Sequence, residues 1–237
     1  MKDIKKLVLA GLLLGISSFE AAAQTIDEIV AKHNEAIGGK VNWDKVKSIK
    51  MEAVIKAQGS EIHTTTFKLD KKAMRQNIAL MGMNGYSIIT NTEGWSFMPF
   101  QGQVKPEAMT ADDVKNSQDD LNIQDEFLTY AEKGKKIEFL GKDDVDGTEC
   151  FKIKMTDKNA KETTYYIDPD NYYLIKRTNK IKANGQEMEN SITYGDYKKL
   201  AEGIVYPMSM SSDGDEIQVV KLDINPVIED SVFKLPN

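Results

Sequence analysis

Two kinds of residue in this sequence could perform chemistry, a serine in a sharp turn and two histidines. The stretch Gly94-Trp95-Ser96-Phe97-Met98 begins like the turn that presents a nucleophilic serine, but that turn needs glycine where Met98 stands. The only histidines are His33, in an expected helix, and His63, in an expected strand. A hydrolase would therefore require one histidine to meet a serine and a carboxylate in one cleft.

Other chemical motifs are weaker. The acidic stretches at 143–147 and 213–216 lack the alternating carboxylates and the closing glutamate of a calcium loop. Cys150 is the single cysteine, so no intramolecular disulfide can form, and a small buried residue in a strand is its expected role. The sequence has no glycine-rich phosphate loop and no dinucleotide fingerprint. We expect a protein that is not an enzyme, with no catalytic residue, no metal and no cofactor.

The first 23 residues have the pattern of an export signal. Lys2, Lys5 and Lys6 precede an apolar run at 7–16, and three alanines end at Ala23. We expect cleavage after Ala23, export to the periplasm and a single domain at 24–237. Because the only cysteine lies far downstream, no lipid anchor is expected, and no later stretch is apolar for long enough to insert stably in a membrane.

The charge of the chain excludes one class of partner. The formal net charge is -6, and Arg75 and Arg177 are the only arginines among 31 basic residues. An acidic chain with so few arginines does not have the electrostatic surface that binds nucleic acid. We expect a monomer that does not bind nucleic acid.

The elements that must position any site begin with one helix. Thr25 and Glu28 have the spacing of a capping box, and Gly38-Gly39 provides a stop after Ile37. From Ser48 the apolar residues alternate, which predicts strands. These strands lie at 49–57, 61–69, 74–81, 86–91, 95–100, 137–140, 150–156, 162–167, 173–181, 187–194, 205–209 and 217–224.

The connections predict how these strands pair. Asp146-Gly147, Asn184-Gly185 and Asp213-Gly214 are dipeptides typical of tight hairpins, so neighbouring strands should be antiparallel. Residues 106–133 break the alternation and predict one or two helices. We therefore expect a mainly β (α+β) fold with a sheet of about eleven antiparallel strands, whose twist leaves a concave face to be filled by helices or ligand.

An aromatic and methionine-rich stretch indicates what could fill that face. The sequence "NTEGWSFMPFQG" at 91–102 places Trp95 and Phe97 on one side of a strand and Met98 and Phe100 on the other. Methionine suits surfaces that accept variable apolar shapes. We predict a hydrophobic cavity lined by Trp95, Phe97, Met51, Met74, Met81 and Met83, with a lid formed by Met109, Phe127 and Leu128.

Several stretches resemble a known family. The order of elements, "YYIDPDNYYLIKR" at 165–177, "YGDYKK" at 194–199 and "INPVIEDSVFKLP" at 224–236 are similar to the periplasmic lipoprotein-sorting carriers and the outer membrane lipoprotein-sorting proteins. The resemblance implies an open, curved antiparallel half-barrel with helices covering its concave face. It also implies a periplasmic carrier or binder of hydrophobic ligands, the acyl chains of lipoproteins or lipids. Arg75 falls where the carriers have an arginine that latches the lid.

One alternative uses the same fold differently. The chain could be an envelope sensor or scaffold that binds a protein segment on the concave face, with transient envelope proteins as partners. A concave face filled by the chain's own helices, with no room for a ligand, would favour that alternative.

Overall fold

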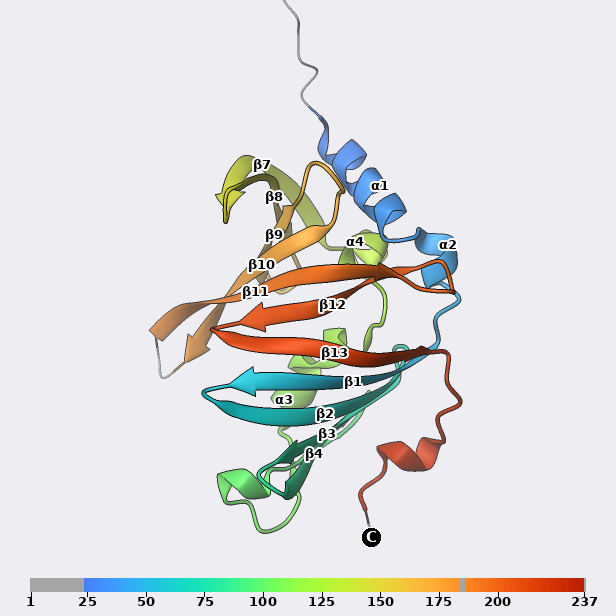
Figure 1. Cartoon of the computed structure of the whole chain (residues 1–237), viewed down its shortest axis with the longest axis vertical. Helices are drawn as coiled ribbons and strands as arrows, with labels where there is room; N and C mark the ends of the chain where they lie inside the picture. The colour runs from blue at the N-terminus through green and yellow to red at the C-terminus, as the bar shows by residue number, and fades with distance from the viewer. Residues whose placement is uncertain (1–23, 184–185, 237) are drawn as a thin grey trace, which may run out of the picture.

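The computed structural model describes residues 24–183 and 186–236, and its strands form a single antiparallel sheet (Figure 1). The strand order is β6-β5-β4-β3-β2-β1-β13-β12-β11-β10-β9-β8-β7. The strands are β1 (Ser48–Ala57), β2 (Ser60–Leu69), β3 (Ala73–Leu80), β4 (Met83–Thr90), β5 (Gly94–Phe97), β6 (Glu107–Ala108), β7 (Lys136–Val145), β8 (Thr148–Thr156), β9 (Glu162–Ile167), β10 (Leu174–Ala183), β11 (Gln186–Lys199), β12 (Val205–Ser212) and β13 (Asp215–Ile224). The predicted fold class is confirmed.

The helical elements are short apart from the first. They are α1 (Ile26–Ala36), α2 (Lys40–Trp43), α3 (Ala111–Asn116) and α4 (Glu126–Thr129), with the 3₁₀ helices η1 (Pro99–Gln101), η2 (Gln118–Leu121) and η3 (Asp230–Phe233). The segment 106–133, predicted as one or two helices, contains α3, η2 and α4, and we call it the helical segment. It also contains β6, the two-residue strand that the sequence pattern did not predict.

The sheet consists of two consecutive meanders. Strands β1–β6 follow one another along the sheet, and so do β7–β13, so the meanders meet where β1 pairs with β13. That pairing runs from Ile49 opposite Ile224 to Lys56 opposite Glu216. Strands far apart in the sequence therefore lie side by side at the centre of the sheet.

The predicted helix cap and two of the predicted hairpin turns are present in the structure. The Glu28 N–H donates to Thr25 Oγ1 at 3.3 Å and the Thr25 N–H donates to Glu28 Oε2 at 3.0 Å, which completes the capping box of α1. Asp146-Gly147 and Asp213-Gly214 both have positive φ, as the tight hairpins require. The third predicted hairpin, Asn184-Gly185, and the predicted signal at 1–23 lie outside the described residues.

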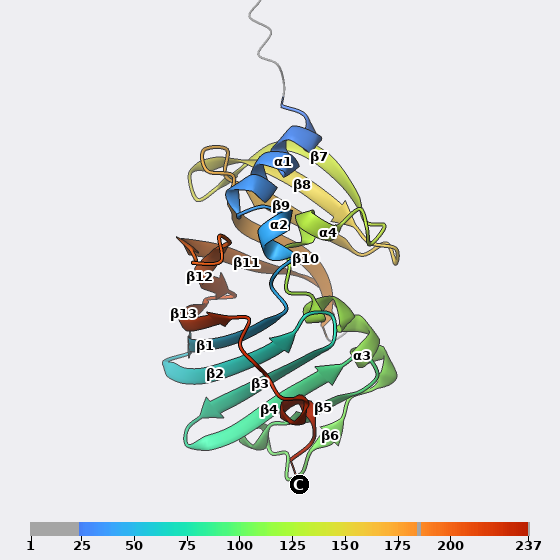
Figure 2. The same ribbon diagram turned by 90° about the vertical axis from the view of Figure 1, so that its right-hand side faces the viewer.

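The sheet curves around the helical segment. Leu121 accepts a hydrogen bond from the Lys71 N–H beside β3, while the ring of Phe127 lies 5.0 Å from that of Tyr165 in β9. Seven strand spacings separate β3 from β9, about 34 Å in a flat sheet, but the six residues from Leu121 to Phe127 reach at most about 21 Å. We call the face toward these helices the inner face; Figure 2 shows α1, α2 and α4 over the upper strands and α3 beside the lower ones.

Apolar clusters lie on both faces of the sheet. On the inner face, Ile29 and Val30 of α1 and Phe127 pack on β8–β10, and a second cluster surrounds Trp43. On the opposite, outer face, Phe233 of the C-terminal segment (residues 225–236) packs on strands β3 and β4. Figure 2 shows this C-terminal segment crossing the lower strands. Both faces at this end of the sheet are therefore covered by other parts of the chain.

Candidate ligand-binding site

A cavity of about 320 Å³ lies between the helical segment and the inner face of the sheet. One wall is aromatic, with Trp43, Tyr165, Tyr194 and Tyr206. The other walls carry charges: Lys68, Lys133, Arg177, Asp119, Asp120, Asp125 and Glu126. This inner cavity is therefore amphipathic, with acidic groups supplied mainly by the helical segment.

Two hydrogen-bond donors in the inner cavity have no acceptor. Tyr165 in β9 and Arg177 in β10 are directly paired, and only 2% of Tyr165 is exposed. Neither the Tyr165 hydroxyl nor Arg177 Nε has a hydrogen-bond partner among the described residues. Burial, with Glu126 nearby, raises the pKa of Tyr165, so its hydroxyl keeps its proton. Buried polar groups in native proteins are usually satisfied, so these two require an explanation.

A row of apolar side chains leads away from this cavity across the inner face. Tyr194 is paired with Met210, Met210 with Ile217, Ile217 with Ile55, and Ile55 with Ile62. All five are half-buried, and Tyr194 and Met210 also line the inner cavity. We call these five residues the apolar row. It offers a continuous strip of partly exposed hydrophobic surface across five strands.

The predicted cavity methionines are only partly brought together. Met51 and Met74 lie on the inner face; Met51 Sδ is 4.0 Å from the Tyr206 hydroxyl, and Met74 is paired with Lys68. Met83, the first residue of β4, also lies on the inner face and is 38% exposed. Met81 sits in the turn after β3 with φ 51° and is 79% exposed, so the structure places it apart from the others.

Trp95 and Phe97 lie on the other face of the sheet from the one predicted. Their partners are Ile88 and Tyr86, which pack against Phe233 of the C-terminal segment. The ring of Phe97 lies 5.8 Å from that of Tyr86. This corrects the predicted orientation: Trp95 and Phe97 belong to an outer core and share no face with the methionines.

Phe100 takes the inner position instead. A Cβ built on Gly85 of β4 would lie 2.9 Å from the Phe100 ring, so this ring packs directly on the glycine backbone. The strand predicted at 95–100 ends at Phe97, so Phe100 reaches the inner side from the 3₁₀ helix η1 and not through strand alternation.

Arg75 also faces outward. Its Nη1 donates to the Val232 carbonyl at 3.0 Å, its Nε donates to Asn77 Oδ1 at 2.7 Å, and its guanidinium lies 4.9 Å from the centre of the Tyr86 ring. The structure therefore corrects the predicted latch. Arg75 fastens the C-terminal segment to the outer face, and the helical segment lies on the opposite side of the sheet.

The predicted lid residues are anchors of the helical segment. Phe127 is 2% exposed and Leu128 is 7% exposed, each within a core cluster. Met109 packs on Gly94, where an added Cβ would lie 2.6 Å from Met109 Sδ, and its N–H donates to the Gly94 carbonyl at 2.8 Å. These three residues hold the segment against the sheet at both of its ends.

Sequence reasoning missed a buried charged pair beside the inner cavity. His33 of α1 is 1% exposed; its Nδ1 lies 2.7 Å from the Tyr172 carbonyl and its Nε2 lies 3.4 Å from Asp125 Oδ1. Two acceptors at the two ring nitrogens fit a doubly protonated ring. Burial favours the neutral ring, but Asp125 and the Tyr172 carbonyl outweigh it and raise the pKa of His33. Burial is likewise outweighed at Asp125, whose pKa is lowered by His33 and the Phe127 N–H.

This pair should make stability depend on pH. Because the pKa of His33 is raised on folding, its contribution is present below its ordinary pKa of 6.5 and is lost as the pH rises through the folded value. The contribution of Asp125 is present above 3.8 and is lost as the pH falls through its lowered value. We expect the urea midpoint to fall from pH 6 to pH 9, and Asp125→Asn to flatten that fall while keeping the helix cap. His63→Gln, at an exposed strand position, should leave the fall unchanged; an unchanged fall in Asp125→Asn would exclude the pair as its source.

His63 lies far from His33. His63 is exposed and is paired with Val54 on the outer face, so the two histidines do not share a cleft. Among the residues that the structure describes, no group of three or more His, Cys, Asp or Glu side chains is placed to hold a metal ion.

Cys150 is fully buried, and burial raises the pKa of its thiol to about 11.

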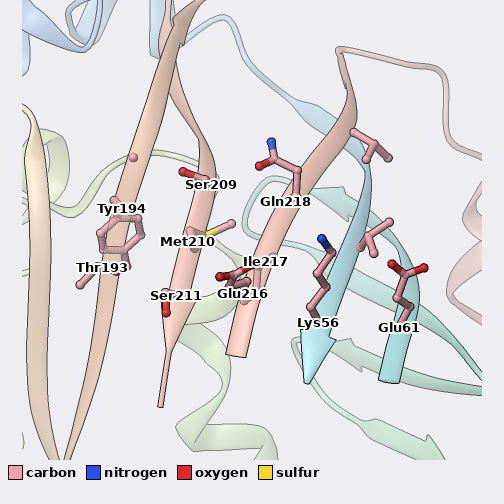
Figure 3. A pocket seen from close by; sticks show the side chains of 13 residues that line it. Lys56, Glu61, Thr193, Tyr194, Ser209, Met210, Ser211, Glu216, Ile217 and Gln218 are labelled. Atoms are coloured by element: carbon pink, nitrogen blue, oxygen red, sulfur yellow. The ribbon is translucent and has the colours of Figure 1, made fainter. Parts of the chain in front are cut away.

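The outer face has a hollow of its own. An open groove of about 590 Å³ runs over β11, β12, β13 and β1, and Figure 3 shows the side chains that line it. Its floor is made of short side chains, including Thr193, Ser209 and Ser211, and Gln218 donates from Nε2 to the Met208 carbonyl at 3.0 Å. The groove is therefore explained by short side chains on a twisted surface.

The fold is shared with several solved proteins of low sequence identity. A LolA superfamily protein from Nitrosomonas europaea is 12% identical with a TM-score of 0.57, covering 90% of this chain and 99% of that one. A domain from Vibrio parahaemolyticus, classed with outer membrane lipoprotein-sorting proteins, is 15% identical with a TM-score of 0.52, covering 87% and 94%. A DUF1329 family protein from Desulfovibrio piger is 13% identical with a TM-score of 0.55, covering 90% and 98%.

These likenesses establish the fold alone. No family model matches the sequence, and no curated protein matches it. The chain has the fold of LolA superfamily and outer membrane lipoprotein-sorting proteins, which confirms the resemblance at the level of architecture. In residues 24–183 and 186–236, no helix has the length and apolarity needed to cross a bilayer.

Proposed function

We propose that this protein, built on the fold of the lipoprotein-sorting proteins, is an exported periplasmic binder or carrier of acyl chains from lipoproteins or lipids. The observation that carries the proposal is the apolar row, which begins in the inner cavity and crosses the inner face half-exposed. Partly exposed apolar side chains that line up across five strands gain free energy when they are covered. Met51 and Met74 lie on the same face of the sheet, four or more residues along the strands from the apolar row.

The size of the surface fits a flexible chain. The row spans four strand spacings, about 19 Å. The inner cavity, at about 320 Å³, lies at the small end of the range found for ligand pockets. Each methylene removed from water contributes about 0.8 kcal/mol, part of which is offset by ordering the chain. A surface that is only half enclosed suits a ligand that must later be released.

The proposal is tested by asking whether lipid accompanies the protein. The chain from Gln24 onward would be purified from the periplasm, extracted with organic solvent and analysed by mass spectrometry, with displacement of a fluorescent fatty acid in parallel. Recovered acyl lipid and displacement are expected. If neither is seen, the carrier proposal is abandoned, and capture of a protein segment on the inner face becomes the function to examine.

One substitution in the apolar row should separate binding from folding. Ile217→Gln places an amide under the ligand, and an unpaired buried amide costs enough to weaken acyl-chain binding about tenfold. The matched control is Val220→Gln, also in β13, because Val220 is 59% exposed. Fluorescent-probe titration of both variants, with thermal midpoints as the folding check, should show loss in the first only. Equal affinities in both would place the ligand elsewhere.

A further inference from the structure

We infer that the inner cavity takes an uncharged acyl carbonyl, an ester or amide, with the Tyr165 hydroxyl and Arg177 Nε as its hydrogen-bond donors. The inference rests on the proposed function and adds to it the chemistry of the ligand's polar end. The apolar row would then hold the attached chain.

Both donors are buried without a well-formed hydrogen bond. Tyr165 and Arg177 are paired across β9 and β10, so their side chains share one part of the cavity wall. Neither donor makes a well-formed hydrogen bond, which costs free energy, although the Glu126 carboxylate lies beside both residues. An oxygen acceptor entering the cavity would recover that cost. Tyr194 adds a third donor to the cavity, because burial raises the pKa of its hydroxyl to about 12 and the proton is kept.

The charges already present decide which acceptor fits. Arg177 Nη1 lies 3.8 Å from Glu126 Oε1, and His33 Nε2 lies 3.4 Å from Asp125 Oδ1, so each of these cations already has a carboxylate beside it. Of the other charges in this cavity, Lys133 lies 3.6 Å from Asp119, and burial lowers the pKa of Lys68 although Asp120 opposes that shift. A fatty carboxylate placed here would meet these acids, whereas a neutral carbonyl accepts from the two donors without repulsion.

The position of the donors matches an acylated molecule. Tyr194 and Met210 belong both to the inner cavity and to the apolar row. A carbonyl held at Tyr165 therefore has an apolar path for its chain that starts in the same cavity. The hydrogen-bond donors in the cavity therefore face the carbonyl end of an ester or amide, and the apolar row lies where its long chain would follow.

The test uses two ligands that differ by one carbonyl. 1-Lauroylglycerol carries an ester, and 1-dodecylglycerol has the ether oxygen alone on a chain of the same length. Titration by probe displacement should show the ester binding about tenfold more tightly to the native protein. Laurate should bind more weakly than 1-lauroylglycerol above pH 7.

Tyr165→Phe is the deciding variant. It should reduce the ester preference below about threefold while the thermal midpoint stays the same or rises, because the removed hydroxyl makes no well-formed hydrogen bond. Tyr166→Phe, the next residue along β9 and on the outer face, should keep the full preference. Equal binding of ester and ether by the native protein, tighter binding of laurate, or an undiminished preference in Tyr165→Phe overturns this inference and leaves the proposed function standing. Binding of none of the three ligands overturns both.

Discussion

Phe127→Ala is expected to destabilise the protein by about 3–5 kcal/mol. The Phe127 ring stands edge-on to Tyr165 at 5.0 Å and to His33 at 5.2 Å, so it joins the helical segment, α1 and β9 at one point. Removing it opens a cavity where three elements meet, and none of them can close it without moving the other two. The helical segment should become more open to proteolysis as well.

Urea unfolding followed by fluorescence measures this loss. Phe100→Ala is the matched control, because Phe100 is half-buried and packs on the backbone of Gly85 in β4. Its removal should cost about 1 kcal/mol. Comparable losses in the two variants would show that the helical segment is not fastened at Phe127.

Gly38→Ala should destabilise the protein by about 4 kcal/mol. Gly38 has φ +103°, and an added Cβ would lie 2.3 Å from the Gly203 carbonyl oxygen and 2.7 Å from Ile204 Cα. Both neighbours are backbone atoms of the turn between β11 and β12, where the Val205 N–H also donates to the Ile37 carbonyl. The end of α1 therefore docks on this turn backbone to backbone, with no flexible side chain to yield.

The adjacent glycine provides the control. Gly39 also has positive φ, at +78°, but a Cβ there would meet nothing within 4 Å. Gly39→Ala should therefore carry the backbone strain alone, and Gly38→Ala should cost roughly 2 kcal/mol more. Thermal and urea unfolding of both variants give the difference. A Gly39→Ala loss as large as that of Gly38→Ala would show that strain, and not the contact with Gly203, sets the cost.

The sequence was most informative where structure is local. The capping box at Thr25, the stop at Gly38 and the turns at Gly147 and Gly214 depend on residues within four positions of one another, and each is present in the structure. Alternation identified the strands for the same reason. The helical segment was harder, because its path is set by the curve of the sheet that it crosses.

The orientation of Trp95 shows what alternation leaves undecided. Strand β4 has apolar residues on both faces, with Ile88 outward and Ile89 inward, so the pattern does not reveal which side is the cavity. Trp95 lies on the outer side because Val232 and Phe233 bury their own side chains against that side of the sheet. Those two residues were visible in the sequence, but their partners, more than a hundred residues away, were not.

The inner cavity could not be predicted for a similar reason. His33 and Asp125 come from the first helix and the helical segment, and Tyr165 and Arg177 from two later strands. Each is unremarkable in its own stretch of sequence. Their chemical significance depends on pairing and burial, which only the closed fold supplies.

The pairing of β1 with β13 also sets an order of assembly. Every other strand neighbour in the sheet is adjacent in sequence, but β1 must wait for the last strand, with all of β2–β12 between them. Contacts this distant form slowly, and until they form β1 presents an open edge that another chain could join. Lys50, Glu52 and Lys56 place charges along that edge. The interval before β13 arrives is thus the stage at which a folding chain is most exposed to aggregation.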